Sequence, residues 1–252
     1  MSISCNLECK VALVSGATCC VGQQFARTLA ASGAAVALAG RESDRVKELE
    51  AEIEARGGHG LGIVMDVNDP ASIQNAVEVA ETELGPINVL VNNAGISRDD
   101  LAVDVTEEDF DAVLDTNLKG SFTLAREVGR RMIERGQGGS IINIASIAAF
   151  RAISGSSVYA MSKAGMVVMT RAMALEWARY NINVNTICPG EIATESNAEY
   201  FNSEKGKAVV AGFPGRDLGK LKDLDGILLL LASDSSAFIT GSTIEVDGGQ
   251  PL

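Results

Sequence analysis

The sequence predicts an α/β protein in which helices flank a doubly wound parallel sheet of about seven strands. Three observations support this fold class. Short runs rich in β-branched residues alternate with longer segments of helical periodicity. The short runs are continuously apolar, as in strands that are buried on both faces of a parallel sheet. The 252 residues contain no internal repeat and no linker, so we expect one domain over residues 1–252.

The strands are predicted from their apolar composition and from the turn residues that bound them. In chain order they span residues 10–15, 35–40, 61–65, 87–91, 140–145, 183–188 and 243–246. The lone histidine, His59, lies in a glycine-rich stretch before the third strand, and we expect it in a surface loop. In such sheets ligands bind beyond the carboxyl ends of the strands, so functional residues are expected there.

The helices are predicted from apolar residues that recur at helical spacing between these strands. They span residues 21–32, 43–56, 70–84, 106–135, 157–180 and 223–231, with a looser helical segment before the last. Pro70 opens the third helix, where its missing N–H costs nothing. We expect an interruption of the long fourth helix near Lys119 and Gly120.

Charge and composition exclude several classes of function. The formal net charge is -12, whereas a nucleic-acid-binding protein needs a basic face. The longest apolar runs are too short to cross a membrane, and residues 1–10 do not resemble a signal peptide. We therefore expect a cytoplasmic protein that binds neither nucleic acid nor membrane.

The cysteines and the single histidine exclude two kinds of site. Five cysteines without a signal peptide indicate free thiols in a reducing compartment. Cys5 and Cys9 lack a second pair at zinc spacing, so no metal site is expected. With His59 as the only imidazole, a Ser-His-Asp hydrolase is disfavoured as well.

A glycine-rich turn joins the first strand to the first helix. A turn of this kind lets backbone N–H groups approach a pyrophosphate, and the helix N-terminus adds partial positive charge. Gly16 is expected to make the tight turn, and Gly22 to let the helix pack closely on the strand. We expect this turn to bind a dinucleotide through Gly16, Thr18, Cys20, Val21 and Gly22. The alternative is a tight turn without a ligand.

The end of the second strand bears on the choice of nicotinamide cofactor. An acidic residue there binds a ribose 2′-OH and repels a 2′-phosphate. This sequence has Gly40 followed by Arg41, whose guanidinium suits a phosphate. We therefore expect NADP(H), with NAD(H) as the alternative if Glu42 binds the 2′-OH and Arg41 is only an exposed charge.

Tyr159 and Lys163 lie one helical turn apart, so both can face one site. A neighbouring ammonium favours the phenolate, which makes the pair a proton donor and acceptor tuned toward neutral pH. Ser146 precedes Tyr159 by thirteen residues at a strand end, and Asn117 lies in the long fourth helix. Each residue alone has a structural explanation, such as a strand-end cap for Ser146.

This set of motifs, in this order, resembles the short-chain dehydrogenase/reductase family from Lys10 to Gly249. The turn resembles the family's T-G-x-x-x-G-x-G motif, with Ser15 in the threonine position and Cys20 in the position of the middle glycine. The N-N-A-G segment at 92–95 is similar too, and amides there can also satisfy backbone groups left open at a strand end. The resemblance implies a single-domain Rossmann-type fold.

The resemblance also implies roles for individual residues. Tyr159 donates a proton to the substrate oxygen or takes it back, Ser146 hydrogen-bonds that oxygen, and Asn117 supports a proton-relaying water. Lys163 holds the nicotinamide ribose and lowers the pKa of Tyr159. The remaining cofactor contacts implied, from the adenine end to the nicotinamide end, are Asp66, Val67, Asn93, Ala94, Gly95, Pro189, Gly190, Ile192 and Thr194.

The implied reaction is hydride transfer between nicotinamide and a small-molecule ketone or secondary alcohol, with a 3-oxoacyl thioester as one candidate substrate. Residues 147–153 and 191–217 are expected to form an apolar substrate pocket, in which Arg151 or Arg216 could bind an acidic group. The resemblance implies a homotetramer. Two alternatives are a non-catalytic NADP-binding or sensing protein on the same fold and a dehydratase or epimerase that uses bound cofactor.

Overall fold

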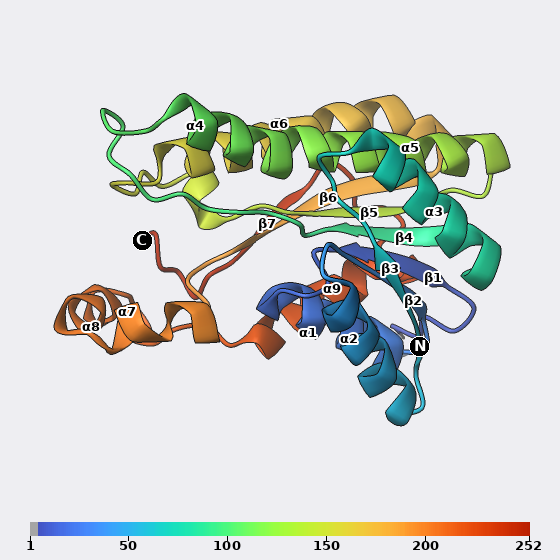
Figure 1. Ribbon diagram of the computed structural model, residues 1–252, viewed down its shortest axis with the longest axis horizontal. Helices are drawn as coiled ribbons and strands as arrows, with labels where there is room; N and C mark the ends of the chain where they lie inside the picture. The colour runs from blue at the N-terminus through green and yellow to red at the C-terminus, as the bar shows by residue number, and fades with distance from the viewer. Residues whose placement is uncertain (1–4) are drawn as a thin grey trace.

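The computed structural model describes residues 5–252 and has a seven-stranded sheet at its centre (Figure 1). The strand order is β3-β2-β1-β4-β5-β6-β7, and every neighbouring pair is parallel. The strands are β1 (Val11–Ser15), β2 (Ala35–Gly40), β3 (His59–Val64), β4 (Ile87–Asn92), β5 (Gly139–Ile144), β6 (Ile182–Pro189) and β7 (Thr243–Val246). The predicted doubly wound parallel sheet is confirmed.

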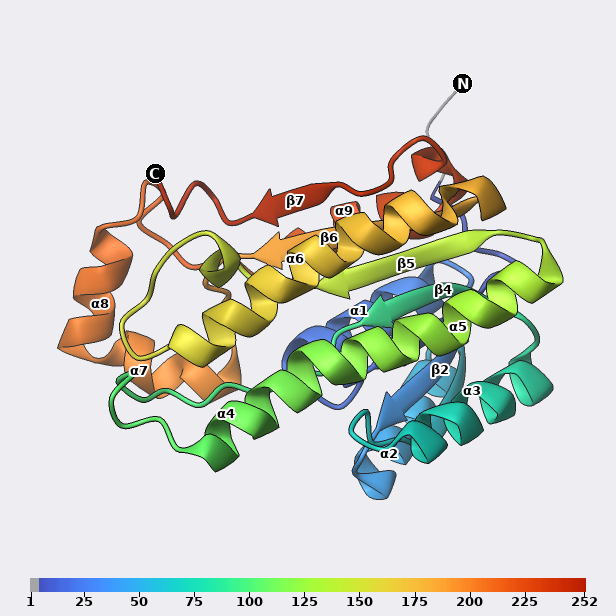
Figure 2. The same ribbon diagram turned by 90° about the horizontal axis from the view of Figure 1, so that it is seen from above.

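Helices cover both faces of this sheet (Figure 2). Buried residues of α1, α2 and α9 pack on one face, and those of α3, α5 and α6 pack on the other. The helices are α1 (Cys20–Ala31), α2 (Ser43–Ala55), α3 (Pro70–Leu84), α4 (Glu107–Leu114), α5 (Ser121–Arg135), α6 (Ser157–Trp177), α7 (Ala198–Asn202), α8 (Glu204–Ala211) and α9 (Asp225–Ala232). Apolar side chains of the strands are therefore buried on both sides, which explains their continuously apolar sequences.

The chain changes direction across the sheet between β1 and β4. From β1 it builds β2 and β3 toward one edge, and it then returns to place β4 on the other side of β1. Val14 of β1 pairs with Val91 of β4, so the two strands end side by side at Ser15 and Asn92. Such a switch point leaves a crevice beyond the strand ends, where α/β proteins bind ligands.

One detail differs from the sequence-based expectation, and one expected interruption is present. His59 is the first residue of β3, exposed and paired with Ala35, so the prediction of a loop was wrong. The predicted long helix is divided into α4, a π-helical turn (Asp115–Gly120) and α5. The expected interruption near Lys119 and Gly120 is therefore confirmed, and it begins at Asp115. Within residues 5–252, no helix has the length and apolarity needed to span a membrane.

Candidate active site

The glycine-rich turn brings the start of α1 against the end of β4. Gly16 has a φ of +62°, and a Cβ there would lie 2.8 Å from the Cα of Ala94. A Cβ at Gly22 would overlap the carbonyl oxygen of Gly16. Both positions therefore require glycine, one for its backbone conformation and one for close packing.

Asn93 and Ser15 hold this turn to β4. The Asn93 side-chain amide donates to the carbonyl oxygens of Ser15 and Gly16, each across 3.1 Å, and to Cys19 Sγ across 3.2 Å. The Ser15 hydroxyl accepts from the N–H groups of Asn93 and Ala94 at 3.0 and 3.1 Å. Asn93 thus hydrogen-bonds backbone groups that would otherwise lack a partner, as expected, and holds the turn in place without lining the cavity.

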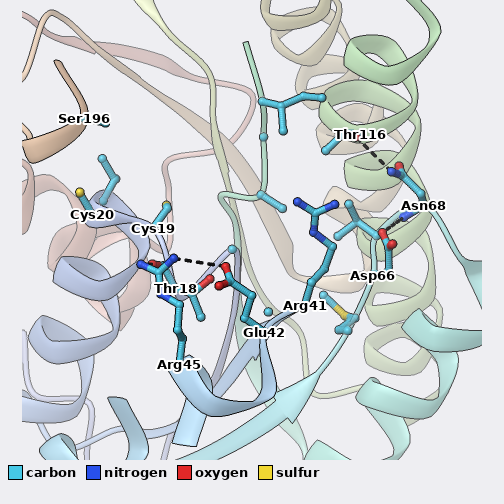
Figure 3. Close-up of a pocket in the computed structure, with 18 of the residues that line it drawn as sticks. Thr18, Cys19, Cys20, Arg41, Glu42, Arg45, Asp66, Asn68, Thr116 and Ser196 are labelled. Carbon is cyan, nitrogen blue, oxygen red and sulfur yellow. Dashed lines mark hydrogen bonds and ion pairs between the residues drawn. The ribbon is translucent and has the colours of Figure 1, made fainter. Parts of the chain in front are cut away.

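A cavity of about 470 Å³ lies in front of the turn, at the carboxyl ends of the strands (Figure 3). Of the predicted cofactor residues it is lined by Gly16, Thr18, Cys20, Val21, Arg41, Asp66, Val67, Ala94, Gly95 and Thr194. Glu42, the alternative contact for a ribose 2′-OH, lines it too. Sequence reasoning assigned no site role to its other lining residues: Cys19, Gly40, Arg45, Met65, Asn68, Ile96, Thr116 and Ser196. The predicted residues Gly22, Asn93, Tyr159, Lys163, Pro189, Gly190 and Ile192 do not line it.

The two arginines where the cavity meets the end of β2 differ in their bonding. The guanidinium of Arg45 forms an ion pair with Glu42 at 3.2 Å and donates to the Thr18 carbonyl oxygen at 2.8 Å. Arg41 has no hydrogen-bond or ion-pair partner within residues 5–252, and it extends into the cavity away from Arg45 (Figure 3). Arg45 therefore neutralises the carboxylate of Glu42, whereas the guanidinium of Arg41 remains available to bind an anion.

The donors around this cavity fit an anionic dinucleotide. In the first turn of α1, the N–H groups of Gly22 and Gln23 bond to Cys19. Those of Cys20 and Val21 have no acceptor within the described chain, and both residues line the cavity. Free N–H groups at a helix N-terminus are suited to phosphate oxygens. Together with the Arg41 guanidinium, these N–H groups can bind a ligand that carries several negative charges.

Tyr159, Ser146 and Lys163 come together next to this cavity. Tyr159 and Lys163 lie one turn apart on α6, with Lys163 Nζ 5.5 Å from the centre of the Tyr159 ring. Ser146, two residues after the end of β5, lies close enough to the Tyr159 side chain to influence the pKa of the phenol. Lys163 is 4% exposed and donates to the carbonyl oxygen of Ile144 across 2.8 Å. The predicted grouping of these three side chains is therefore present.

The ionisation of the pair differs from the expectation that Lys163 lowers the pKa of Tyr159. Burial raises the pKa of Tyr159 to about 12, against the hydrogen bond from Ser146, and the charges of Glu191 and Asp99 raise it further. Burial likewise lowers the pKa of Lys163 to about 8. Because a buried lysine is partly neutral near that pH, and because Nζ lies over the ring, it gives little support to a phenolate. The pKa of Tyr159 therefore lies above its ordinary value in this structure, and its lowering by Lys163 stays a prediction.

Asn117 lies inside the π-helical turn and is completely buried. Its side chain accepts from the Ile96 N–H at 2.8 Å and donates to the Ile96 carbonyl oxygen at 2.9 Å. It also donates to the Ser162 hydroxyl at 3.0 Å. Gly95 lies beside it, where a Cβ would stand 3.2 Å from Asn117 Oδ1 and 3.5 Å from Lys163 Nζ. Asn117 therefore connects the segment after β4 with the helix that carries Tyr159.

The segment after β6 is held mainly by backbone contacts. The Gly190 N–H donates to the Val246 carbonyl oxygen at 3.0 Å, and a Cβ on Gly190 would lie 2.8 Å from the Cα of Asp247. Ile192 is buried, and its carbonyl oxygen accepts from the Asn197 side chain at 2.8 Å. Of the four residues predicted here, only Thr194 reaches the cavity.

Comparisons with known proteins agree with this geometry. The sequence matches the model of the family described as "Enoyl-(Acyl carrier protein) reductase" over residues 16–250. It is 35% identical to the 3-oxoacyl-[acyl-carrier-protein] reductase of Escherichia coli, over 97% of this chain and 98% of the relative. It is 37% identical to the 2-dehydro-3-deoxy-D-gluconate 5-dehydrogenase of Dickeya dadantii, over 97% of this chain and 96% of the relative.

A solved structure gives the same result. The crystal structure of a gluconate 5-dehydrogenase from Burkholderia cenocepacia, in complex with NADP and tartrate, superimposes with a TM-score of 0.94 at 33% identity. The match covers 98% of this chain and 97% of that chain. With the glycine-rich turn, the cavity before it and the Tyr159–Lys163 pair, these matches establish that the chain belongs to the short-chain dehydrogenase/reductase family of NAD(P)-dependent oxidoreductases.

Proposed function

We propose that this protein is an NADP(H)-preferring enzyme that interconverts a ketone and a secondary alcohol. The observation that carries the proposal is the pairing of Tyr159 with Lys163 one turn further along the same helix, next to the cavity, with Ser146 near the phenol. A hydroxyl and a phenol that lie near each other can both bind one substrate oxygen. The bound nicotinamide would supply or accept the hydride.

The cofactor would be held along the cavity by the residues that line it. The N-terminus of α1, at Cys20 and Val21, supports binding of the phosphates. Arg41 supports binding of a 2′-phosphate, because its guanidinium is free and the nearby Glu42 is paired with Arg45. Asp66 and Val67 also line the cavity, and we propose that they bind the adenine. This arrangement favours NADP(H) over NAD(H).

The catalytic residues would divide the proton transfer among them. Tyr159 would give its phenolic proton to the carbonyl oxygen during reduction and take it back during oxidation. Ser146 would donate a hydrogen bond to the same oxygen and stabilise its developing charge. Lys163, at the inner side of Tyr159, would hold the nicotinamide ribose and replace the phenolic proton. Asn117 would hold the segment after β4 in place beside Lys163.

The decisive experiment follows NADPH absorbance with a panel of ketones and 3-oxoacyl thioesters, and NADP⁺ reduction with secondary alcohols. We expect turnover of at least one class, and a loss of about 1000-fold in kcat in Tyr159→Phe with NADPH binding retained. Tyr180→Phe is the matched control, since its hydroxyl accepts a hydrogen bond from exposed Arg179 and lies outside the cavity. NADPH binding without any redox change would favour the sensing alternative, and substrate conversion with retained nucleotide would favour a dehydratase or epimerase.

We propose in addition that the protein is a homotetramer, as members of this family often are. An apolar groove of about 760 Å³ on the outer side of α5 and α6 supports contact with a second copy, and Phe122 in it is 43% exposed. Light scattering is expected to give four times the chain mass for the wild type and a lower mass for Phe122→Glu. The cytoplasmic location and the extent of the domain over residues 1–252 stay predictions.

A further inference from the structure

Gln250, in the segment after β7, carries a buried side-chain amide that the roles above do not use. The residue is 6% exposed. Its side chain accepts from the Glu191 N–H at 2.6 Å and donates to the Glu191 carbonyl oxygen at 3.2 Å. A Cβ on Gly190 would lie 2.5 Å from Gln250 Oε1, so the two residues pack closely. One side chain thus binds both backbone polar groups of Glu191, as a neighbouring strand would.

The backbone of Gln250 is tied to the segment after β5. Its carbonyl oxygen accepts from the Arg151 guanidinium at 3.1 Å. Arg151 follows the short 3-10 turn at Ile147–Ala149, and its own N–H donates to the Ile147 carbonyl oxygen at 3.0 Å. The Ser146 hydroxyl accepts a hydrogen bond from a backbone N–H of that turn. Gln250 therefore connects the segment after β6 with the turn that begins at Ser146.

The segment after β6 runs from Glu191 to the cavity without a free stretch between them. The Gly219 N–H donates to the Glu191 carbonyl oxygen at 3.0 Å. Asn197 accepts from the Thr194 N–H at 2.9 Å and donates to the Ile192 carbonyl oxygen at 2.8 Å. Thr194 lines the cavity. Because three residues span about 11 Å at most, a displacement of Glu191 is passed on to the cavity wall at Thr194.

We propose that Gln250 is a positioning residue for the nicotinamide of the bound cofactor. By binding both backbone groups of Glu191, it sets the position of the segment through which Thr194 reaches the cavity. The 2′-phosphate and the pyrophosphate would be held by other elements, at Arg41 and at the N-terminus of α1. Loss of the Gln250 contacts therefore acts on the nicotinamide end alone. This inference rests on the proposed function, because it assumes that the nicotinamide binds at the segment after β6.

The test compares NADPH with adenosine 2′,5′-bisphosphate, which carries the adenine and the 2′-phosphate but no nicotinamide. Gln250→Met removes both hydrogen bonds to Glu191 with little change of volume. We expect the Kd for NADPH to rise by about 10-fold, and the Kd for the bisphosphate to change little. The fluorescence enhancement of bound NADPH, which reports on the nicotinamide, is expected to decrease.

Two further variants serve as references for Gln250→Met. Gln250→Glu keeps an acceptor for the Glu191 N–H and is expected to recover part of the NADPH affinity and fluorescence. The matched control is Leu252→Ala, because Leu252 is 99% exposed and lies two residues beyond Gln250. We expect this control to bind both ligands as the wild type does. Retained binding of the bisphosphate in each variant also shows that the variant is folded.

Each other result has a definite meaning. An equal rise in the Kd for both ligands in Gln250→Met would show that Gln250 only supports the fold, and would overturn the positioning role. Unchanged NADPH affinity and fluorescence would overturn it as well, while ketone turnover by the wild type would leave the proposed function intact. The expected binding changes without any wild-type turnover would support the role of Gln250 and overturn the proposed enzyme. A wild type that does not bind NADPH would overturn both.

Discussion

The side-chain amide of Asn117 donates a hydrogen bond to the Ser162 hydroxyl at 3.0 Å, and Ser162 donates to the backbone carbonyl oxygen of Tyr159 at 2.6 Å. Asn117 is also bonded to both backbone groups of Ile96. A continuous chain of hydrogen bonds thus runs from the segment after β4, through the π-helical turn, to the first turn of α6. These bonds hold the first turn of α6, and with it the backbone of Tyr159, in place relative to the segment after β4.

Removal of the Ser162 hydroxyl tests this connection. Ser162→Ala leaves one donor of Asn117 unpaired and loosens the start of α6. Since small displacements of a catalytic group are costly, we expect kcat to fall by about 10- to 100-fold, with KM and NADPH binding little changed. Ser157→Ala, on the same helix, is the control. A rise in KM without a fall in kcat would indicate that Ser162 supports the substrate pocket and not the position of Tyr159.

The buried ammonium of Lys163 predicts a pH dependence of stability. Its pKa is about 8 in the folded protein and 10.5 ordinarily. Between these values the unfolded chain binds more protons, so the contribution of Lys163 to the free energy of unfolding rises with pH. Below pH 8 its burial is destabilising by about 3 kcal/mol, and above pH 10.5 this penalty is gone.

Urea unfolding of the wild type and of Lys163→Met, each without cofactor, measures this effect. The wild type is expected to gain stability relative to Lys163→Met between pH 8 and pH 10.5. The difference between the two proteins removes the opposite contributions of Tyr159 and Cys188, whose pKa values burial raises to about 12. A difference that stays constant over this range would show that Lys163 keeps its ordinary pKa.

The unpaired guanidinium of Arg41 predicts the effect of its removal on cofactor choice. Arg41→Ala is expected to lower kcat/KM for NADPH by about 10- to 100-fold and to change that for NADH little, because only NADPH carries the 2′-phosphate. Arg45→Ala is expected to lower the same preference by freeing the carboxylate of Glu42. Arg56→Ala, at the far end of α2, is the control. Higher kcat/KM for NADH than for NADPH in the wild type would contradict the NADP(H) assignment.

Cys20 places a Cβ and a sulfur at the cavity wall, in the position where the family motif has a glycine. Cys20→Gly is expected to tighten NADPH binding, measured by fluorescence titration, because the backbone can then approach the phosphates more closely. The same change weakens the first turn of α1 by up to about 1 kcal/mol, which a small fall in Tm would report. Cys9→Gly, outside the cavity, serves as the control for loss of a thiol. Weaker NADPH binding in Cys20→Gly would show that the sulfur contributes to the site.

Much of the fold could be predicted because its signals are local. The bounds of α3, at Pro70 and Leu84, agree with the prediction because a proline and a glycine flank the apolar pattern. Gly16 and Gly22 could be identified because a strand, a turn and a helix follow one another within a few residues. The buried strands were recognisable from their continuous apolar runs.

The features that could not be predicted depend on contacts between distant segments. The π-helical turn forms where Asn117 binds the backbone of Ile96, 21 residues earlier in the chain. Arg45 reaches the cavity because α2 lies against the glycine-rich turn, so its contact with Thr18 has no local signal. The raised pKa of Tyr159 arises from burial by the surrounding elements.

The π-helical turn at Asp115–Gly120 also limits how this stretch can change in length. Such a turn usually amounts to one residue added to an α-helix, and each residue rotates the helix by about 100°. Deletion of one residue between 115 and 120 would bring α4 and α5 into the phase of one straight helix and turn Asn117 away from Ile96. A deletion scan is therefore expected to find this stretch intolerant, while the exposed turn at 214–217 accepts changes in length.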